Sequence, residues 1–239
     1  MRILAFESSA KAASVALLED GRLLAEYFQN SGQTHSRTLM QMAEDMIRNC
    51  DLTVGQIDAA AVAAGPGSFT GVRIGVAAAK GFCWGRELPC YGVSTLEAMA
   101  QPFSFVDGIL VPAMDARRSQ VYTAVFEAEH GILRRLMEDA AISVEDLGRQ
   151  LEKLEKPKFL VGDGAELCYN TLGQCVRGLR LAPEHLRMQR AGGVALAAQA
   201  MIERGEAGDA SALTPAYLRL SQAERERMEK LQNREESTE

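Results

Sequence analysis

The sequence predicts an α/β protein in which one arrangement of strands and helices occurs twice. Apolar runs of strand length alternate along the chain with stretches of helical periodicity. Each half starts with a strand hairpin, a third strand and a helix. In each half a later buried strand then ends in a glycine turn that opens a further helix, at 65–71 and again at 162–164. Two related α/β domains follow from this repetition.

The first half opens with three strands. Residues 2–7 and 14–18 are apolar runs on either side of a short polar turn, which predicts a hairpin. Asp20-Gly21 is a second turn signal, and residues 23–28 form the third strand. The remaining elements of this half are, in order, a helix at 34–50 capped by Thr34, a buried strand at 59–64, a helix at 70–86, a strand at 88–93, and a helix that Ser94 caps and Gln101-Pro102 ends.

From residue 109 the same order starts again. A strand at 109–114 ends in Asp115, and a short turn leads to a second strand at 121–126. The later elements are a strand at 132–137, a helix at 143–154 capped by Ser143, a strand at 159–161, the glycine turn with its helix, an alanine-rich helix at 194–204 preceded by Gly192 and Gly193, and an extended segment at 215–219. Residues 221–239 alternate acids and bases without an apolar face, so we expect a frayed or disordered tail without a function.

The repeat is one of topology, without supporting sequence identity. Glu7 and Asp115 occupy the same place in it, at the end of the first strand of each hairpin. The order is that of the actin, sugar-kinase and heat-shock ATPase (ASKHA) architecture, two α/β domains with a cleft between them, whereas a Rossmann fold begins strand, helix, strand. We expect an actin-like domain at 1–105 and a second at 106–220, whose final helix is able to pack back on the first.

Composition narrows the functional classes. Of 239 residues, 47% are hydrophobic and 24% are charged, which is ordinary for a globular protein. No apolar run reaches the ~18 residues of a membrane span and no secretion signal is recognisable, so we expect a cytoplasmic protein without membrane contact. The five cysteines show no C-x-x-C spacing and are expected to be reduced, mostly buried and free of metal. A net charge of −6 argues against broad tRNA or DNA binding by this chain alone.

Residues 65–75, with the sequence GPGSFTGVRIG, are the most informative stretch. A strand, a glycine turn and a helix in this order aim backbone N–H groups and the positive end of the helix dipole at one point, where an anion could bind. The glycines equally suit a sharp turn and close packing of the helix on its sheet, and the sequence leaves both interpretations open. No lysine follows Gly71, which excludes a Walker loop, and the context excludes a dinucleotide-binding fingerprint.

Few side chains suggest catalysis. Glu7 and Asp115 could position a metal-bound nucleotide or a catalytic water in the cleft, but we favour solvated or capping roles for single carboxylates at strand ends. His35 lacks a second metal ligand one turn further on, where Leu39 stands. Ser68 is not part of a G-x-S-x-G elbow and has no evident His–Asp partners.

Two helices offer a docking surface. In the helix at 70–86, Gly71, Gly75 and Ala79 recur every four residues and form a narrow face that another helix could approach closely. The helix at 34–50 carries three methionines, whose flexible side chains suit adaptable contacts. Each face could instead pack on the chain's own sheet, which is the better interpretation for any single helix. Taken together, the two faces predict a partner surface.

The chain resembles the TsaB (YeaZ) family, bacterial proteins required for the threonylcarbamoyladenosine modification of tRNA. Four segments carry the resemblance: FESS at 6–9, THS at 34–36, the glycine segment at 65–75, and PAYLR at 215–219. The resemblance covers nearly the whole chain except the charged tail. It implies the two-domain actin-like fold and a non-catalytic role, and no nucleophile–base set supports the older glycoprotease (M22 peptidase) label.

The resemblance also implies partners. In this pathway the related subunit TsaD transfers threonylcarbamoyl to N6 of the adenosine next to the anticodon, with a metal held by two histidines four apart on a helix. His35 and Leu39 stand in that neighbourhood here, which agrees with a subunit that lacks this chemistry. We expect the chain to pair with TsaD, to reach the ATPase TsaE through the complex, and to meet tRNA only indirectly. Family members also self-associate as homodimers through the TsaD surface.

The expected interface, with TsaD or with a second copy, lies on the helices at 34–50 and 70–86 and comprises His35, Leu39, Met42, Met46, Gly71, Gly75, Ala78, Ala79 and Phe82. No tightly bound cofactor is expected, and weak ATP or ADP contact is left open at Glu7, Ser8, Ser9, Gly67, Ser68 and Thr70. The alternative function is a small actin-like ATPase or kinase that uses the cleft. The variant Gly75→Arg is expected to abolish the TsaD complex while leaving the isolated fold largely intact.

Overall fold

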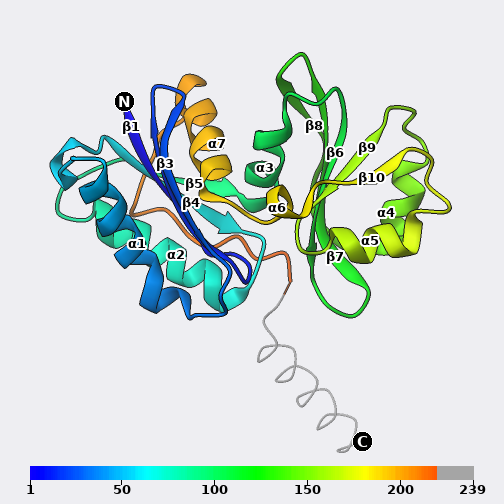
Figure 1. Cartoon of the computed structure of the whole chain (residues 1–239), viewed down its shortest axis with the longest axis horizontal. Coiled ribbons are helices and arrows are strands. Elements are labelled where there is room, and N and C mark those ends of the chain that lie inside the picture. Colours follow the sequence, from blue (N-terminus) through cyan, green and yellow to red (C-terminus); the bar gives the residue numbers. More distant parts are fainter. Residues whose placement is uncertain (220–239) are drawn as a thin grey trace, which may run out of the picture.

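Two five-stranded mixed sheets lie side by side in the molecule (Figure 1). The computed structural model describes residues 1–219, so the tail expected at 221–239 lies outside the described residues. Helices cover both faces of the first sheet and separate it from the second (Figure 1). The site described below is built where the two halves meet and on the outer helices of the first half.

The first sheet has the strand order β3-β2-β1-β4-β5. Strand β1 pairs antiparallel with β2 and parallel with β4, so that Ala5 lies between Ala16 and Ala61. All three alanines are fully buried, because helices cover both faces of the sheet. The strands are β1 Arg2–Glu7, β2 Ala13–Glu19, β3 Arg22–Gln29, β4 Ala59–Gly65 and β5 Cys90–Ser94.

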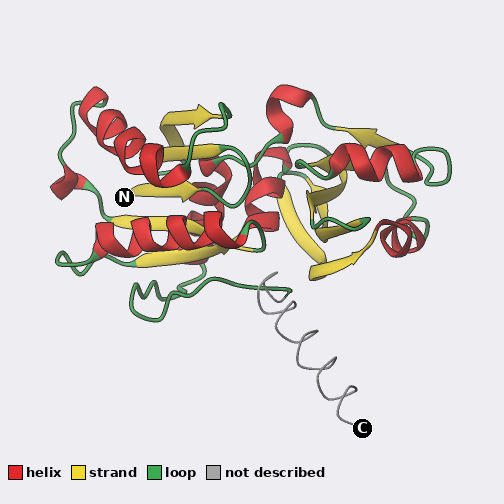
Figure 2. Ribbon diagram, turned by 90° about the horizontal axis from the view of Figure 1, so that it is seen from below, coloured by secondary structure: helices red, strands yellow, loops and turns green. Residues whose placement is uncertain are grey.

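Helices α1 (His35–Asn49) and α2 (Phe69–Cys83) cover one face of this sheet, the near face in Figure 2, and α7 (Ala191–Glu203) covers the other (Figure 1). Alternate residues of β1 serve the two cores: Leu4 and Phe6 face α1 and α2, while Ile3 and Ala5 face α7. A 3₁₀ turn, η1 (Val54–Gln56), follows α1 and carries a capping box between Thr53 and Gln56.

The second sheet repeats the first, with the order β8-β7-β6-β9-β10. Helices α4 (Val144–Leu151) and α5 (Ala165–Leu172) cover one face. The other face packs on α3 (Thr95–Ala100) and the 3₁₀ turn η2 (Gln101–Phe103), and α3 also contacts α7. The strands are β6 Gly108–Asp115, β7 Gln120–Glu129, β8 Ile132–Ser143, β9 Lys158–Val161 and β10 Leu179–Leu181. The duplicated α/β topology predicted from the sequence is confirmed.

The helix starts follow the predicted capping residues in most cases. The predicted caps Ser94 and Ser143 each accept a hydrogen bond from the backbone N–H three residues on, whereas Thr34 occupies the cap position of α1 without a side-chain bond. Ser68, which was not predicted as a cap, accepts the same kind of bond at the start of α2. Two short elements were not predicted from the sequence, β10 and the single turn α6 (Glu184–Arg187). Among residues 1–219, no helix combines the length and the apolar character needed to span a membrane.

The start of α7 differs from the prediction. The two glycines expected before this helix lie inside its first turn. An added Cβ on Gly193 would stand 2.0 Å from the carbonyl oxygen of Ala98 in α3. The glycine is therefore needed for the close crossing of two helices, and it does not mark the beginning of one.

Candidate functional site

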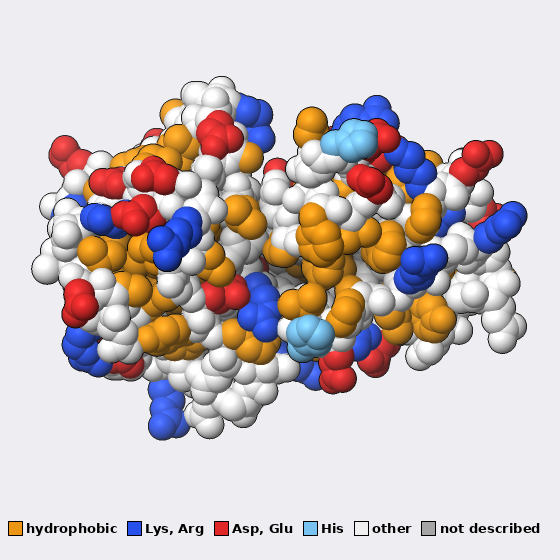
Figure 3. Space-filling view, turned by 45° about the horizontal axis from the view of Figure 1, so that its top comes forward, with side chains coloured by type: hydrophobic (Ala, Val, Ile, Leu, Met, Phe, Trp, Pro, Cys, Tyr) orange, Lys and Arg blue, Asp and Glu red, His pale blue; other side chains and the backbone are white. Residues whose placement is uncertain are grey.

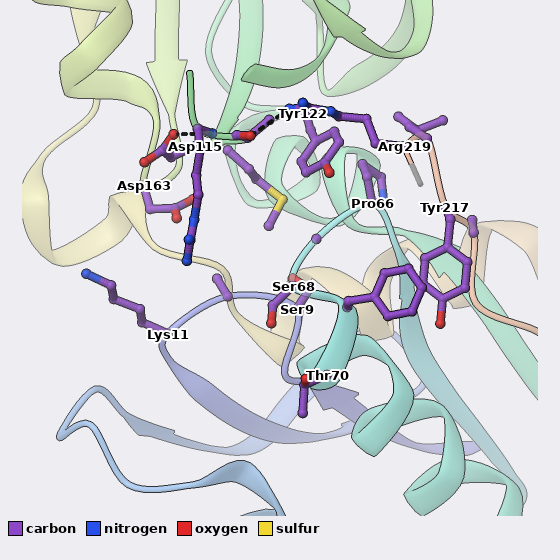
Figure 4. A pocket seen from close by; sticks show the side chains of 18 residues that line it. Ser9, Lys11, Pro66, Ser68, Thr70, Asp115, Tyr122, Asp163, Tyr217 and Arg219 are labelled. Carbon is purple, nitrogen blue, oxygen red and sulfur yellow. Dashed lines mark hydrogen bonds between the residues drawn. The ribbon is translucent and has the colours of Figure 1, made fainter. Parts of the chain in front are cut away.

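A cleft of about 510 Å³ lies between the two halves of the molecule (Figure 4). One wall carries Ser9, Ser68 and Thr70 from the first half, and the opposite wall carries Asp115 and Asp163 from the second. A carboxy-terminal strap, residues 207–219, runs along the first half and closes one side of the cleft with its last residues. The cleft is thus made where the carboxyl ends of parallel strands in both sheets converge.

The glycine turn after β4 owes its composition to close packing. A Cβ on Gly67 would lie 2.5 Å from the carbonyl oxygen of Ser9, and the Ser68 N–H donates to that same oxygen over 2.6 Å. Gly65 adopts a φ of 124°, in the region that favours glycine, with the strap backbone at Ala216 pressed against it. These contacts support the packing interpretation of the glycine segment, while anion binding at 67–70 stays a prediction.

Glu7 and Asp115 occupy equivalent strand ends but have opposite surroundings. Glu7 is buried; its Oε1 accepts a hydrogen bond from the Ser9 N–H over 2.6 Å, and its Oε2 has no partner among residues 1–219. Burial raises the pKa of Glu7 to about 7, and the negative charge of Asp163 adds to this effect. The expectation of a solvated carboxylate is therefore wrong for Glu7, although its Oε1 caps the following turn at Ser9. Asp115 is exposed and does act as a cap, accepting from the Arg117 N–H over 2.7 Å.

The charges around the cleft are mixed. Lys11, Arg117 and Arg219 stand near the carboxylates of Asp115 and Asp163. Burial raises the pKa of Asp163, whose Oδ1 accepts from the amide of Gln189 over 2.8 Å. The face of the molecule drawn in Figure 3 likewise intersperses acidic and basic side chains without a large area of one sign. Neither the cleft nor this face has the continuous basic stripe that nucleic acid binding requires.

The strap is fixed by an aromatic and cationic cluster. Tyr217 stacks on Phe69 with ring centroids 4.0 Å apart, and the Arg73 guanidinium lies 4.3 Å from the Phe69 ring. Arg73 Nε also donates to the Tyr217 hydroxyl over 2.7 Å, and Arg219 donates to the carbonyl of Ala116 in the second half. The strap therefore ties the glycine turn of one half to the hairpin turn of the other. From the sequence, only the family resemblance at 215–219 singled it out.

No Ser–His pair is present in the cleft among the described residues. Its lining within residues 1–219 includes no histidine, and the Ser68 hydroxyl is engaged as the α2 cap. His35 lies elsewhere, with Nε2 3.3 Å from the carbonyl oxygen of Lys11. Over the same residues, no three His, Cys, Asp or Glu side chains come close enough together to hold a metal ion.

The small-residue stripe of α2 faces inward. A Cβ on Gly71 would lie 2.1 Å from the carbonyl oxygen of Ser8, and one on Gly75 would lie 2.5 Å from Ser8 Oγ and 3.2 Å from Val62 Cγ2. Ala79, the third member of the stripe, is fully buried. The stripe lets α2 approach its own sheet, so the prediction that it forms a narrow face for another helix is wrong. Gly75→Arg would disrupt the fold and cannot report on a partner.

The outer faces of α1 and α2 instead enclose an open groove of about 960 Å³. Ala77 and Gly81 of α2 are exposed along it, and Met40 of α1 and Val54 of η1 are each 44% exposed. Charged side chains surround this apolar floor. The lining residues are Arg37, Met40, Gln41, Ala43, Glu44, Ile47, Arg48, Leu52, Thr53, Val54, Ala77, Ala78, Gly81, Phe82 and Arg86.

Comparison with known proteins identifies the family. The chain is 32% identical to the tRNA threonylcarbamoyladenosine biosynthesis protein TsaB of Bacillus subtilis over 228 residues, which cover 94% of this chain and 96% of that protein. The chain belongs to the TsaB family. It is also 37% identical to TsaB of Escherichia coli over 69% of this chain and 72% of that protein.

Two further comparisons bear on the fold of this TsaB family member. A family model described as TsaD, tRNA N6-adenosine threonylcarbamoyltransferase, matches residues 23–227. The crystal structure of YeaZ from Pseudomonas aeruginosa aligns with a TM-score of 0.75 at 26% identity, covering 91% of this chain and 99% of that one. The activator of 2-hydroxyisocaproyl-CoA dehydratase from Clostridium difficile aligns with a TM-score of 0.52 at 11% identity, over 86% and 97% of the two chains. The actin-like fold predicted from the sequence is confirmed.

The residues that the TsaB resemblance assigns to an interface fall into two groups. Leu39, Met46, Gly71, Gly75 and Ala79 are buried within the monomer, and Phe82 is nearly so although it reaches the groove floor. His35, Met42 and Ala78 keep partial exposure, and of these Ala78 lines the groove. The predicted interface residues thus lie largely on the inner faces of α1 and α2, and the interface itself stays a prediction. Met40, one of the three methionines singled out in the sequence, does line the groove, whereas the exposed lining residues Val54, Ala77 and Gly81 were not predicted, because small and apolar residues occur on both sides of these helices.

The six residues considered for weak nucleotide contact also fall into two groups. Ser9, Gly67, Ser68 and Thr70 line the cleft, whereas Glu7 and Ser8 lie behind it and do not. The Ser8 hydroxyl is committed to the carbonyl of Gly71 over 2.9 Å.

Proposed function

We propose that this protein is a non-catalytic subunit for the threonylcarbamoyladenosine modification of tRNA, and that it docks the catalytic subunit TsaD through the groove between α1 and α2. The open apolar groove is the observation that carries the proposal. Met40, Val54 and Ala77 remain exposed there, and a soluble monomer gains nothing from leaving such a surface open. The relatives named above supply the pathway.

The match to a TsaD family model supports a sister protein as the occupant. Two related folds can present the same pair of helices to one another, which gives a pairing close to a two-fold interface. The same reasoning allows two copies of this chain to pair as a homodimer, in competition with TsaD. In this arrangement TsaE joins through the complex, and tRNA is held by the partners.

A single substitution tests the docking surface. Ala77→Arg places a cation on the exposed floor of the groove, and we expect it to weaken TsaD binding at least ~100-fold, because an unpaired buried charge costs about 3–5 kcal/mol. Asn170→Arg, on the exposed face of α5 in the second half, is the matched control and should bind normally. Circular dichroism establishes that both variants fold. Unaltered TsaD binding by a folded Ala77→Arg protein would refute the proposal.

An actin-like ATPase or kinase is the second candidate, favoured by the polar cleft with Lys11, Arg117 and the hydroxyls of Ser9 and Ser68. Weak ATP or ADP contact at 67–70 belongs to this alternative. Calorimetry with ATP and Mg²⁺ on the isolated protein separates the two. Tight binding with turnover supports the enzyme, whereas weak or absent binding without turnover supports the docking subunit.

A further inference from the structure

Charged side chains recur along the groove between α1 and α2. Arg37, Glu44 and Arg48 lie on one face of α1. Arg86 follows the carboxy-terminal end of α2. Arg48 is ion-paired with Asp45 one turn earlier, so its charge is largely offset within α1. Among residues 1–219, Arg37, Glu44 and Arg86 are exposed and form no ion pair, which leaves these three charges available to a partner.

Neutral oxygen atoms hold the two available arginines in place. Arg37 Nη1 donates to the side-chain oxygen of Gln33 over 2.9 Å. Arg86 donates to the carbonyl oxygens of Val54 and Phe82 over 2.9 and 2.6 Å, and its guanidinium lies 4.2 Å from the Phe82 ring. An amide or carbonyl oxygen orients a guanidinium without cancelling its charge, so both arginines remain positioned cations with N–H groups left for a carboxylate.

The three available charges alternate in sign along the groove. Arg37 lies in the first turn of α1, and Glu44 lies two turns further on, about 10 Å along the helix axis. Arg86 is bonded to Val54 of η1, which follows the carboxy-terminal end of α1, so it stands at the opposite end of the groove from Arg37. From either end, the order of charges is positive, negative, positive.

We propose that this order of charges selects a partner whose docking face is apolar, with an acidic side chain at each end and a basic one between them. Such a face brings an opposite charge to each available groove charge, while its apolar residues cover Met40, Val54 and Ala77. The inference rests on the proposed function and makes it more specific: the occupant is the docking face of TsaD, in preference to a second copy of this chain.

A second copy of the chain lacks such a face. A two-fold interface brings the same surface of each copy together, with the two grooves aligned in the same or in opposite directions. Because the order of charges is the same from both ends, either alignment places arginine near arginine and one Glu44 near the other. Like charges across an interface weaken the wrong pairing. The groove therefore favours the acidic-ended partner over self-association.

Glu44→Gln tests the selection by the sign of its effect. Losing the central carboxylate removes an attraction to TsaD and a repulsion between two copies. We expect TsaD binding to weaken ~3-fold and self-association to strengthen ~3-fold, as for one exposed charge pair. Titration calorimetry with TsaD and sedimentation equilibrium of the protein alone measure the two affinities. Unchanged or tighter TsaD binding, or weaker self-association, would overturn the proposal.

Arg37→Glu tests one end of the groove against a control of equal net charge. The control is Arg177→Glu, at an exposed position in the second half. At about 0.05 M NaCl we expect Arg37→Glu to weaken TsaD binding ~10-fold, because an attraction becomes a repulsion, and the control to bind like the wild type. At about 0.5 M NaCl, screening should bring the two variants within ~3-fold of each other. Circular dichroism establishes that both variants fold.

The outcomes separate this inference from the proposed function. Equal TsaD affinities of the folded Arg37→Glu and Arg177→Glu proteins at low salt would overturn the charge selection, and the docking proposal would stand if Ala77→Arg still blocks binding. Unaltered TsaD binding by Ala77→Arg contradicts docking at the groove itself. A ~10-fold difference that persists at high salt would also overturn the charge selection, because screening weakens an exposed charge pair.

Discussion

In each half of the molecule a pair of helices covers one face of an equivalent sheet. The two helices pack tightly against each other in one half and leave a groove between them in the other. In the second half, α4 and α5 are eight residues each, and a Cβ on Gly148 would lie 2.6 Å from Leu172 Cδ2, so the two helices press together. In the first half, α1 and α2 are fifteen residues each, and their outer faces leave a groove of about 960 Å³.

This difference shows where a glycine is needed for close packing within the monomer and where it leaves open space for a partner. Gly75 and Gly148 both stand at close contacts, Gly75 against Ser8 and Val62 of β4 and Gly148 against Leu172 of α5. Gly81 faces open space, with nothing within 4 Å of an added Cβ. Glycine therefore permits close packing at positions 75 and 148 and leaves open space at position 81.

The largest expected effect separates the inner and outer faces of α2. Gly75→Leu forces a side chain against Ser8 and Val62, and we expect a loss of about 4 kcal/mol in the free energy of unfolding, because that core has no space to relax. Ala77→Leu, two residues on and exposed, should change stability by less than ~0.5 kcal/mol. Urea unfolding followed by circular dichroism measures both, and similar losses for the two variants would contradict the inward orientation of the stripe.

A pH effect distinguishes the two strand ends. The pKa of Glu7 is about 7 in the fold against an ordinary 4.5, so the folded state keeps a proton that the unfolded chain releases. This contribution to stability is fully present below pH 4.5 and is lost as the pH rises through about 7, with a total of about 3 kcal/mol.

The matched variants isolate that effect. Glu7→Gln cannot ionise and should lack this component of the pH dependence, whereas Asp115→Asn, at the exposed equivalent position, should retain it. Unfolding free energies measured at intervals between pH 4.5 and 8 provide the comparison. A Glu7→Gln curve parallel to the wild-type curve would show that Glu7 does not hold its proton.

A larger side chain between α4 and α5 of the second half should destabilise the protein. Gly148→Leu meets Leu172 at once, but the contact is with the end of a flexible side chain, so we expect a loss of about 2 kcal/mol, smaller than at Gly75. Thermal unfolding measures this loss. A larger loss than for Gly75→Leu would reverse the order of the two contacts.

The smallest effect is a gain. Gly81→Ala adds a methyl group to the open side of α2 and removes backbone freedom from the unfolded chain, so we expect a stabilisation of about 0.5–1 kcal/mol. The equivalent measurement by urea unfolding checks it. Destabilisation would mean that the groove is not open in solution.

The sequence could predict the order of elements, the repeat and the serine caps at Ser94 and Ser143, because each is encoded locally by periodicity and turn chemistry. It could not say which side of α2 meets the sheet, since small residues occur around the whole helix. The burial of Glu7 was equally hidden, because its surroundings come from distant parts of the chain: the adjacent Ser8 bonds to Gly71 of α2, and the charge of Asp163 acts on Glu7. The three residues of β10 carry too short a pattern to recognise.

Helix α7 completes the core of the first half although it lies late in the chain. The alanines of α7 form much of the core under the first sheet, against Ile3 and Ala5, although more than 180 residues separate them along the chain. During synthesis on the ribosome, one apolar face of the amino-terminal sheet therefore stays uncovered until α7 has emerged. Nascent chains stalled before residue 191 should depend on chaperones that shield this face, and a separately produced fragment of residues 1–105 should aggregate.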